Sequence, residues 1–369
     1  MISPISGTAL LDKTALLDDS LRHFPSQAAD TPEIRELRAG LPSLGWPMTL
    51  IQKHASLEEA RLALVTVAGI DLPPVQDLAA PAWVLSSVPW LGLPEETACM
   101  MSRPPVWIRL QTEDTTPVSS EFANLGVDWQ PSVVLPGAWR VNAGRVDLSG
   151  TTAFKAGLFE VQDLGSQAIL AAVDVAPGGR WRDACAGAGG KTLQLARLLG
   201  PGGRVDAQDL RPETLRELRA RFARARSFLG ATVSTLEADA TQGGGAGLYD
   251  GVLCDAPCTG SGTWRRSPHL RWQLTQDAVS SASQLQLRIL RAQARHVRVG
   301  GHLVYATCSI LPDENSAVIR AFLALPGSQE FELAPIARDF GMLDDAGLTI
   351  RPSLEDNDSF FVSRMKRCR

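Results

Sequence analysis

The 369-residue sequence is poor in the residues that build metal sites and disulfides. It has five histidines and six cysteines, and no two cysteines form a CxxC pair. No group of Cys and His residues has zinc-site spacing, which excludes a zinc finger or ribbon and predicts no bound metal. Scattered cysteines are typical of reduced thiols, so we expect a cytoplasmic protein. The six are Cys99, Cys185, Cys254, Cys258, Cys308 and Cys368.

Signals for a membrane are also lacking. No apolar run is long enough to cross a bilayer. Asp12, Asp18 and Asp19 lie close to the first apolar residues, which fits neither a signal nor a transit peptide. The net charge of −4 argues against a general basic coat for polyanions but allows a local basic face. With 44% hydrophobic and 21% charged residues, the chain is expected to be globular, with two or more domains, and a monomer.

From residue 180 onward, short apolar runs alternate with helix-like segments. Alternation of this kind predicts a Rossmann-like α/β fold, a doubly wound and mostly parallel sheet covered on both faces. We expect this domain to span residues 161–369, after a small α+β module at 99–160 and a partly helical region of unclear role at 1–98. The expected strands of the domain are 180–186, 204–210, 231–239, 249–255 and 302–308, and those of the module include 106–110 and 133–135.

The stretch 251–266 is the centre of the candidate site. An apolar strand runs into Asp255, then a proline, Cys258, a glycine-rich bend and the pair Arg265 and Arg266. Since ligands bind at the carboxyl ends of parallel strands, Asp255 and Cys258 are expected at the mouth of a site. The alternative is a structural turn with an ordinary buried cysteine.

A second glycine-rich turn follows the first strand, at residues 183–192. Its glycines allow backbone N–H groups to approach an anionic group at a helix N-terminus. A P-loop would need glycine at the position of Cys185, so that pattern fails. Asp209 follows about 20 residues later at the end of the second strand, where an acid binds ribose hydroxyls. The pair favours an adenosine-type cofactor, with Asp239 a candidate for its adenine amino group.

Cys308 ends the fifth strand, so it is expected beside Cys258 at one edge of the sheet. Two thiols there indicate either a redox pair or covalent catalysis, and a redox pair is usually spaced CxxC. Nearby cations, for which Arg265 and Arg266 are candidates, would favour a thiolate.

Together these motifs resemble the RsmB/Sun-type family of RNA cytosine-5 methyltransferases. The resemblance rests on Asp-Ala-Cys-Ala-Gly-Ala-Gly-Gly-Lys-Thr, Asp-Ala-Pro-Cys-Thr-Gly-Ser-Gly with the arginine pair, and Ala-Thr-Cys-Ser, in family order. It covers residues 100–369, and one departure is Gly187-Ala188, where the family more often has Ala-Pro. The resemblance implies a class I methyltransferase fold with S-adenosylmethionine as cofactor and RNA as partner, ribosomal RNA before tRNA.

The family chemistry gives the residues their implied roles. Cys308 would add to C6 of cytosine and activate C5, Asp255 would hold the N3/N4 edge, and Cys258 would assist release of the adduct. The target base must leave its stack. The implied cofactor-binding residues are Cys185, Ala186, Gly187, Ala188, Gly189, Gly190, Lys191, Asp209, Asp239 and Asp255.

RNA contacts are expected from two basic segments. Arg265 and Arg266 are predicted to bind phosphate, and Trp264 and Trp272 to stack bases. An arginine-rich helix at 211–226 either joins them or is a solvated surface. Two rival classes remain open, a P-loop nucleotidase and a non-catalytic RNA-binding protein on the same fold.

Overall fold

A computed structural model describes residues 80–244 and 247–369; the prediction for residues 1–79 lies outside the described residues. The chain forms two compact units, Met1–Pro104 with Ser261–Thr275, and Pro105–Gly260 with Gln276–Arg369. The segment Ser261–Thr275 therefore groups with the smaller unit, whereas the sequence analysis placed it in the domain at 161–369. The reason is visible in two buried arginines of this segment, Arg265 and Arg271, which donate to backbone carbonyls just before Pro104.

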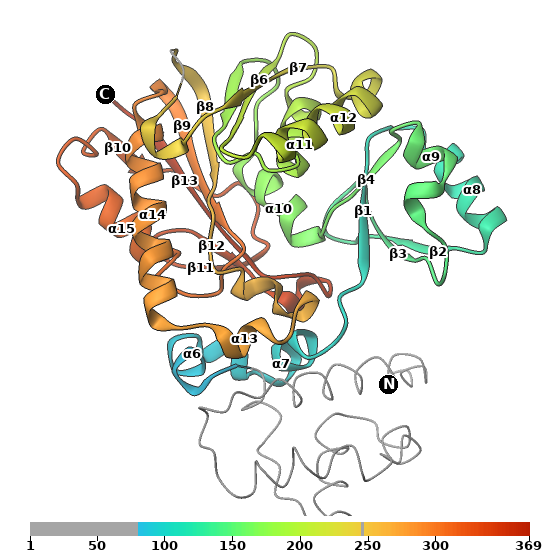
Figure 1. Ribbon diagram of the computed structural model, residues 1–369, viewed down its shortest axis with the longest axis horizontal. Coiled ribbons are helices and arrows are strands. Elements are labelled where there is room, and N and C mark those ends of the chain that lie inside the picture. The colour runs from blue at the N-terminus through green and yellow to red at the C-terminus, as the bar shows by residue number, and fades with distance from the viewer. Residues whose placement is uncertain (1–79, 245–246) are drawn as a thin grey trace, which may run out of the picture. The chain divides into compact units, whose positions relative to one another are not determined.

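The larger unit contains a nine-stranded sheet in the order β11-β12-β13-β9-β8-β5-β6-β7, with β10 beside β13 (Figure 1). Strands β5 to β9 run parallel, and β10 to β13 are antiparallel to their neighbours. The predicted Rossmann-like α/β fold is confirmed. The strands are β5 (Arg180–Asp183), β6 (Arg204–Asp209), β7 (Thr232–Glu237), β8 (Tyr249–Asp255), β9 (Val297–Thr307), β10 (Phe331–Leu333), β11 (Gly341–Leu343), β12 (Leu348–Ile350) and β13 (Phe360–Arg367).

Helices cover both faces of this sheet, as Figure 1 shows. Alternate residues of β8 point to opposite faces: Leu253 packs in the core under α10 to α12, and Val252 and Cys254 pack in the core under α14 and α15. The helices are α10 (Leu164–Val173), α11 (Gly190–Leu199), α12 (Pro212–Leu229), α14 (Gln276–Ala294) and α15 (Ser316–Ala324). None of the described helices is long and apolar enough to cross a membrane.

A separate four-stranded antiparallel sheet, in the order β2-β3-β1-β4, forms the small α+β module. Ile108, Phe122, Trp139 and Phe159 are buried in its core. Its elements are β1 (Val106–Leu110), α8 (Thr116–Leu125), β2 (Asp128–Pro131), β3 (Ala138–Asn142), the 3-10 helix η2 (Leu148–Gly150), α9 (Thr152–Lys155) and β4 (Phe159–Val161).

The predicted strand at 133–135 is absent from this module, and the prediction was wrong. The Ser132 hydroxyl accepts the backbone N–H groups of Val134 and Leu135, at 3.2 and 3.0 Å. Glu355 accepts the N–H of Val133. A side chain that takes the backbone donors competes with strand pairing, so the segment bends instead.

The smaller unit is helical in its described part. Its elements are α6 (Ala82–Ser87), η1 (Pro89–Gly92), α7 (Pro94–Met100), η4 (Ser261–Arg266) and α13 (Leu270–Gln273). Two further 3-10 helices, η3 (Ala240–Gln242) and η5 (Pro352–Leu354), belong to the larger unit.

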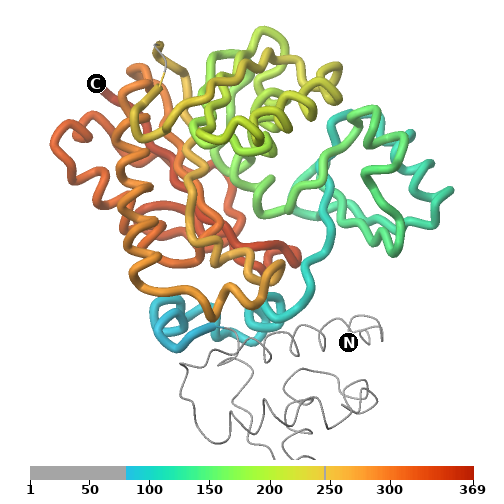
Figure 2. Tube along the Cα trace, viewed as in Figure 1, coloured from blue at the N-terminus to red at the C-terminus, as the bar shows by residue number. Residues whose placement is uncertain are grey.

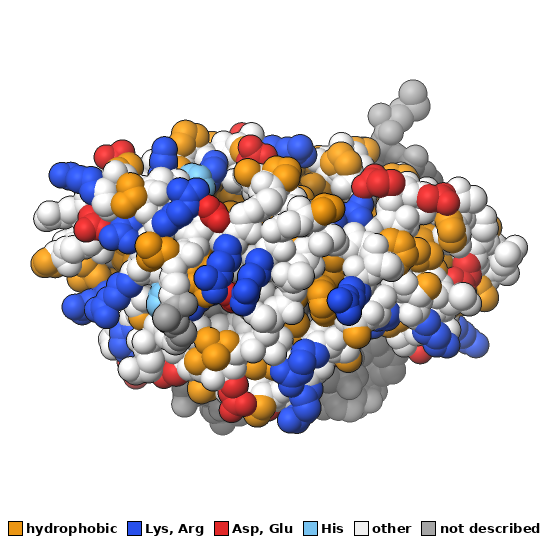
Figure 3. Space-filling model, turned by 90° about the horizontal axis from the view of Figure 1, so that it is seen from above, with side chains coloured by type: hydrophobic (Ala, Val, Ile, Leu, Met, Phe, Trp, Pro, Cys, Tyr) orange, Lys and Arg blue, Asp and Glu red, His pale blue; other side chains and the backbone are white. Residues whose placement is uncertain are grey.

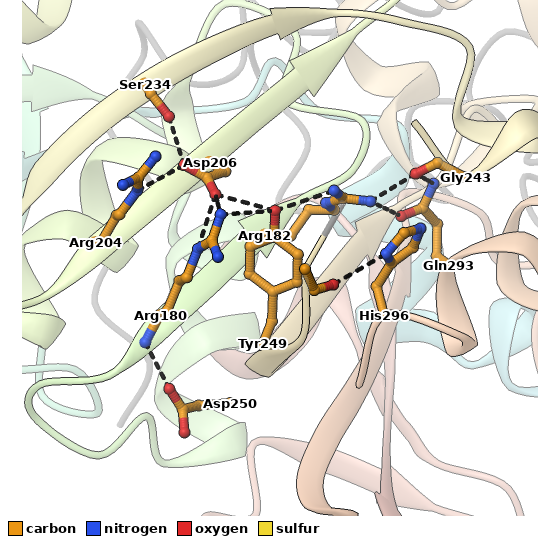
Figure 4. Close-up of polar contacts among 11 residues, drawn as sticks. Arg180, Arg182, Arg204, Asp206, Ser234, Gly243, Tyr249, Asp250, Gln293 and His296 are labelled. Carbon is orange, nitrogen blue, oxygen red and sulfur yellow. Dashed lines mark hydrogen bonds and ion pairs between the residues drawn. The ribbon is translucent and has the colours of Figure 1, made fainter. Parts of the chain in front are cut away.

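A polar network joins the amino-terminal halves of four strands of the large sheet (Figure 4). Asp206 of β6 accepts hydrogen bonds from Arg180, Arg204, Ser234 and Tyr249. Burial opposes its charge, but these donors outweigh burial and lower the pKa of Asp206 to about 2. The guanidinium groups of Arg180 and Arg182 each lie 4.6 Å from the centre of the Tyr249 ring. These charges therefore stabilise β5 to β8 against one another.

Basic side chains are spread over the surface. Figure 3 shows one face on which Lys and Arg form several separate groups, divided by uncharged and apolar side chains. On that face there is no continuous basic coat, in keeping with the net charge of −4.

Candidate active site

The carboxyl ends of four neighbouring strands, in the order β9-β8-β5-β6, meet at one edge of the large sheet. Asp183 ends β5, Asp209 ends β6, Asp255 ends β8, and Cys308 directly follows β9. Residues far apart in the sequence are thereby brought to one place, as parallel topology requires.

A cavity of about 680 Å³ opens at this edge. Its volume is in the range of pockets that hold small molecules and cofactors. Of the predicted catalytic and cofactor residues, all except Gly189 line it. The lining residues include Cys185, Ala186, Gly187, Ala188, Gly190, Lys191, Asp209, Asp239, Asp255, Cys258 and Cys308.

The glycine-rich turn between β5 and α11 depends on two positive backbone φ angles. Gly187 has φ +51° and Gly189 has φ +90°, a region that glycine enters at little cost. A Cβ atom on Gly189 would lie 2.7 Å from Cγ of Leu218, so the turn packs tightly against α12. Gly189 therefore shapes the cavity from behind rather than lining it.

Asp209 is tied to this turn. Its Oδ2 accepts the N–H of Gly187 at 2.8 Å, and its Oδ1 accepts the backbone N–H and Nε of Arg211 at 2.9 and 3.1 Å. Burial opposes ionisation, but these donors outweigh it and hold the pKa of Asp209 below its usual range. Asp239, on the same side of the cavity, accepts the N–H and hydroxyl of Thr241 at 2.8 Å each. Both carboxylates are thus hydrogen-bond acceptors held in fixed orientations.

Lys191 and Asp255 form an ion pair across the cavity. The Nζ atom lies 2.7 Å from Oδ2 of Asp255, linking the start of α11 to the end of β8. Burial opposes the ammonium charge, but attraction to Asp255, their hydrogen bond and the nearby Cys308 outweigh it, so the pKa of Lys191 is raised. Lys191 remains a cation and fixes the carboxylate beside the cysteines.

The sulfur atoms of Cys258 and Cys308 are 3.3 Å apart, and both side chains are partly buried. The hydrogen bond with Cys308, followed by burial, raises the pKa of Cys258 well above its usual range. Cys258 is therefore held as a thiol beside Cys308. The expectation that the two cysteines lie side by side on neighbouring strands agrees with this geometry.

Asp183 stands behind the glycine turn and is fully buried. Its Oδ2 accepts the hydroxyl of Thr192 at 2.7 Å, and Oδ1 has no hydrogen-bond partner within the described part of the chain. Burial raises the pKa of Asp183 to about 7, against the lowering effect of Thr192. The folded protein therefore binds a proton here that the unfolded chain releases near pH 4.

Replacing Asp183 with Asn is expected to remove a pH dependence of stability. Because the folded pKa is raised, the contribution of Asp183 is full below pH 4 and is lost as the pH rises to about 7. Relative to Asp183→Asn, the wild-type free energy of unfolding should fall by a few kcal/mol, at about 1.4 kcal/mol per unit of pKa shift, over that range. Urea unfolding at pH 4.5, 6 and 8 measures this, and parallel curves would contradict it.

Several cavity residues were missed by sequence reasoning. Gln162 lies just before α10, and Ser166 lies in its first turn. Leu285 and Ile289 belong to α14, and Leu210 follows Asp209. The apolar members provide a surface on which a flat ring can lie. The sequence held one signal, a large apolar residue, Leu210, directly after the strand-end Asp209; the structure leaves it 64% exposed at the cavity.

The two predicted RNA-binding arginines differ in the structure. Arg265 is buried and donates to the hydroxyl of Ser102 at 2.9 Å and to the carbonyls of Ser102 and Arg103. Its expected phosphate contact does not fit this burial, since the guanidinium already serves the packing of its own unit. Arg266 is exposed. Trp264 is also buried, which does not fit base stacking.

The arginine-rich helix α12 is partly committed to internal contacts. Arg221 and Arg224 both pair with Glu160 of β4, a buried carboxylate of the small module. Arg219 donates to the hydroxyl of Thr235. Arg216 and Arg226 are exposed. The helix therefore attaches the module to the large sheet with one face.

Within residues 80–244 and 247–369, no group of three or more His, Cys, Asp and Glu side chains is arranged to hold a metal ion. The cavity is lined by acids, a lysine and three thiols, Cys185, Cys258 and Cys308.

The chain is similar to proteins of known family. It is 32% identical over 257 residues to the probable ribosomal RNA small subunit methyltransferase B of Synechocystis sp., covering 68% of this chain and 57% of that protein. The methyltransferase B of Enterobacter sp. is 31% identical over 270 residues, covering 71% and 60%. The chain thus spans less than two thirds of the length of these relatives.

Solved structures agree in fold. The crystal structure of PH0851 covers 97% of this chain with a TM-score of 0.72 and 26% identity, over 88% of its own length. NSun6 from Pyrococcus horikoshii with SFG covers 72% of this chain and 92% of its own, with a TM-score of 0.63 and 17% identity.

The model of the 16S rRNA methyltransferase RsmB/F family matches residues 170–366. The match covers more than half of the chain and contains Cys258, Cys308 and the glycine-rich turn. The chain belongs to the RsmB/F family of 16S rRNA methyltransferases.

Proposed function

We propose that this protein transfers a methyl group from S-adenosylmethionine to C5 of a cytosine in RNA, with ribosomal RNA as the first candidate substrate. The observation that carries it is the 3.3 Å separation of Cys258 and Cys308, beside a cavity of cofactor size. Further support comes from the relatives named ribosomal RNA small subunit methyltransferase B.

The cofactor fits the donors and acceptors of the cavity. The glycine-rich turn at the start of α11 would receive its amino-acid end, Asp209 its ribose and Asp239 its adenine amino group. Leu210, Leu285 and Ile289 would contact the adenine faces. Bound there, S-adenosylmethionine supplies an electrophilic methyl group.

The remaining chemistry belongs to side chains of the chain. The Cys308 thiolate adds to C6 of cytosine, and the electron pair of the C5–C6 double bond makes C5 nucleophilic. Asp255, oriented by Lys191, holds the N3/N4 edge of the base and stabilises its protonated form. After C5 gains the methyl group, a base, for which water can serve, takes the C5 proton; the electron pair of the C5–H bond restores the double bond, and Cys308 leaves as a thiolate. Cys258, held as a thiol at 3.3 Å, assists this release by donating a proton to the departing sulfur.

A methyl-transfer assay tests the proposal directly. The protein is incubated with methyl-labelled S-adenosylmethionine and transcripts of small-subunit ribosomal RNA or tRNA, and the RNA is digested to nucleosides. Label is expected in 5-methylcytidine, in ribosomal RNA before tRNA, and not with Cys308→Ala. Label in another nucleoside, or none in either RNA, would contradict the proposed reaction.

The same proposal assigns a phosphate contact to the exposed Arg266. Arg266→Ala is expected to weaken RNA binding and to lower the slope of log K against log salt by about one, because one fewer counterion is released. The matched control is Arg204→Ala, which replaces an exposed arginine of the polar network in Figure 4. This variant should keep the slope of the parent protein. Filter binding at several salt concentrations gives both slopes; an unchanged slope for Arg266→Ala would show that it does not touch phosphate.

A further inference from the structure

Glu314 is a fully buried acid in the loop between β9 and α15. Its carboxylate accepts four hydrogen bonds, two on each oxygen. Oε2 accepts the backbone N–H of Thr259 and the side-chain amide of Gln286, each at 2.9 Å. Oε1 accepts the hydroxyls of Thr259 and Ser309, at 2.5 and 2.7 Å. All four donors are neutral, so the acid is held by hydrogen bonds to uncharged groups.

Two of the residues that donate to Glu314 are sequence neighbours of the two cysteines. Thr259 directly follows Cys258, and Ser309 directly follows Cys308. One carboxylate therefore binds the residue next to each cysteine, from two loops that are far apart in the sequence. Gln286 of α14 adds a second contact, because its amide also donates to the carbonyl of Pro257, directly before Cys258, at 3.0 Å.

The neighbouring Asn315 fixes the Cys308 loop from its other side. Its Nδ2 donates to the carbonyl of Ser309 at 2.8 Å, and its Oδ1 accepts the hydroxyl of Thr307 at 2.6 Å. The loop is thus held before and after Cys308, and Glu314 is the group that joins it to the Cys258 loop.

We infer that Glu314 is the positioning residue that sets the distance between the two sulfurs. Its value for catalysis rests on the proposed function, in which Cys258 must reach the adduct formed by Cys308. A carboxylate suits this place because it accepts four donors at once, whereas an amide offers one accepting oxygen and presents N–H groups to the others. In Glu314→Gln the amide nitrogen replaces one accepting oxygen, so two of the four hydrogen bonds are lost or must reverse direction.

The closing rate of a Cys258–Cys308 disulfide reports the sulfur separation without RNA or cofactor. With diamide as oxidant, two thiols held at 3.3 Å should close promptly in the wild type, seen by mass after alkylation under denaturing conditions. Glu314→Gln is expected to close at least tenfold more slowly. The control Asp206→Asn, which disrupts a half-buried acid of the polar network in Figure 4, should stay within twofold of the wild type. A wild type that does not close, or a Glu314→Gln protein that closes as fast, would overturn the inference.

Two milder variants cover the case in which Glu314→Gln does not fold. Thr259→Val removes one donor and keeps the backbone N–H, and Ser309→Ala removes the donor of the other loop. Each should slow closure several-fold, and wild-type rates in both would also overturn the assignment.

Enzymatic readouts separate this inference from the proposed function. In Glu314→Gln, the kcat for methyl transfer should fall at least tenfold, with the Kd for S-adenosylmethionine unchanged, since Asp209 and Asp239 are untouched. If closure slows but no variant methylates RNA, positioning stands and the proposed reaction fails. If methylation is present and equal in both proteins while closure slows, the spacing is real but catalysis does not need it, and the inference as stated fails.

Discussion

Cys308→Ala is expected to abolish methyl transfer, and Cys258→Ala to accumulate a covalent protein–RNA adduct. Without the Cys308 thiol, C5 of cytosine never becomes a nucleophile, so the rate should drop on the order of a thousandfold or more, as for loss of other covalent nucleophiles. Without Cys258, addition and one methylation proceed, but release stalls. The protein–RNA bond should then survive denaturing electrophoresis.

The structure bears on the different roles expected of Cys308 and Cys258. The sulfurs are close enough for either to be imagined as the nucleophile, but the raised pKa of Cys258 keeps it protonated beside Cys308. A protonated thiol is a poor nucleophile, which is consistent with the proposed attack by Cys308. The double variant should form no adduct, because Cys308 acts first.

A denaturing gel with labelled RNA and S-adenosylmethionine distinguishes the alternatives. A redox pair predicts similar defects in both single variants and a strong dependence on reductant. A buried structural pair predicts lower thermal stability and no adduct in either. An adduct from Cys308→Ala, or none from Cys258→Ala during turnover, would reverse or remove the assigned roles.

Asp209→Ala is expected to weaken binding of S-adenosylmethionine ten- to hundredfold. A charge-assisted hydrogen bond from a ribose hydroxyl is worth roughly 1.5–3 kcal/mol, and Asp209 also holds the N–H of Gly187 in the glycine-rich turn. Calorimetric titration of the folded variant measures the loss. Asp209→Asn, which keeps an accepting oxygen and the shape, should lose less.

A control is needed because Asp209 also supports the turn. Thr192→Val removes the hydroxyl bonded to Asp183 behind the same turn, without touching a predicted ribose ligand. It should lower thermal stability and leave the cofactor Kd within a few-fold. If Asp209→Ala binds cofactor as tightly as the wild type, the ribose assignment is wrong.

The parallel strands were predictable from their alternation with helix-like segments, and four of the five, β5 to β8, end in an acid. The strand predicted at 249–255 is β8 (Tyr249–Asp255). Its side chains alternate between the two hydrophobic cores on opposite faces of the sheet, so both faces of the strand are packed. Helix α15 begins only at Ser316, although the helix-like pattern of the sequence already starts at Glu314. Glu314 and Asn315 are helix-like in pattern, but their side chains serve the cysteine loops instead.

The features that the sequence did not reveal depend on contacts between residues that are far apart in the chain. Nothing local distinguishes Arg265 from Arg266, yet one guanidinium is buried against carbonyls of Ser102 and Arg103 and the other is exposed. Similarly, Ser132 gives no sign in the sequence that its hydroxyl will take the donors of a neighbouring apolar run. Gln162 reaches the cavity because α10, which follows it, packs beside α11, where Gln194 accepts the side-chain amide of Gln162.

The place of β13 in the sheet has a consequence for biosynthesis. Figure 2 shows this red segment beside the orange β9, and it pairs with β9 on one side and β12 on the other. Every other strand precedes it in the chain. Until residues 360–367 have left the ribosome, β9 presents an unpaired edge just below the Cys308 loop, open to pairing with another chain. The sheet is therefore completed only after residues 360–367 have been synthesised, and until then the free edge of β9 needs protection from aggregation.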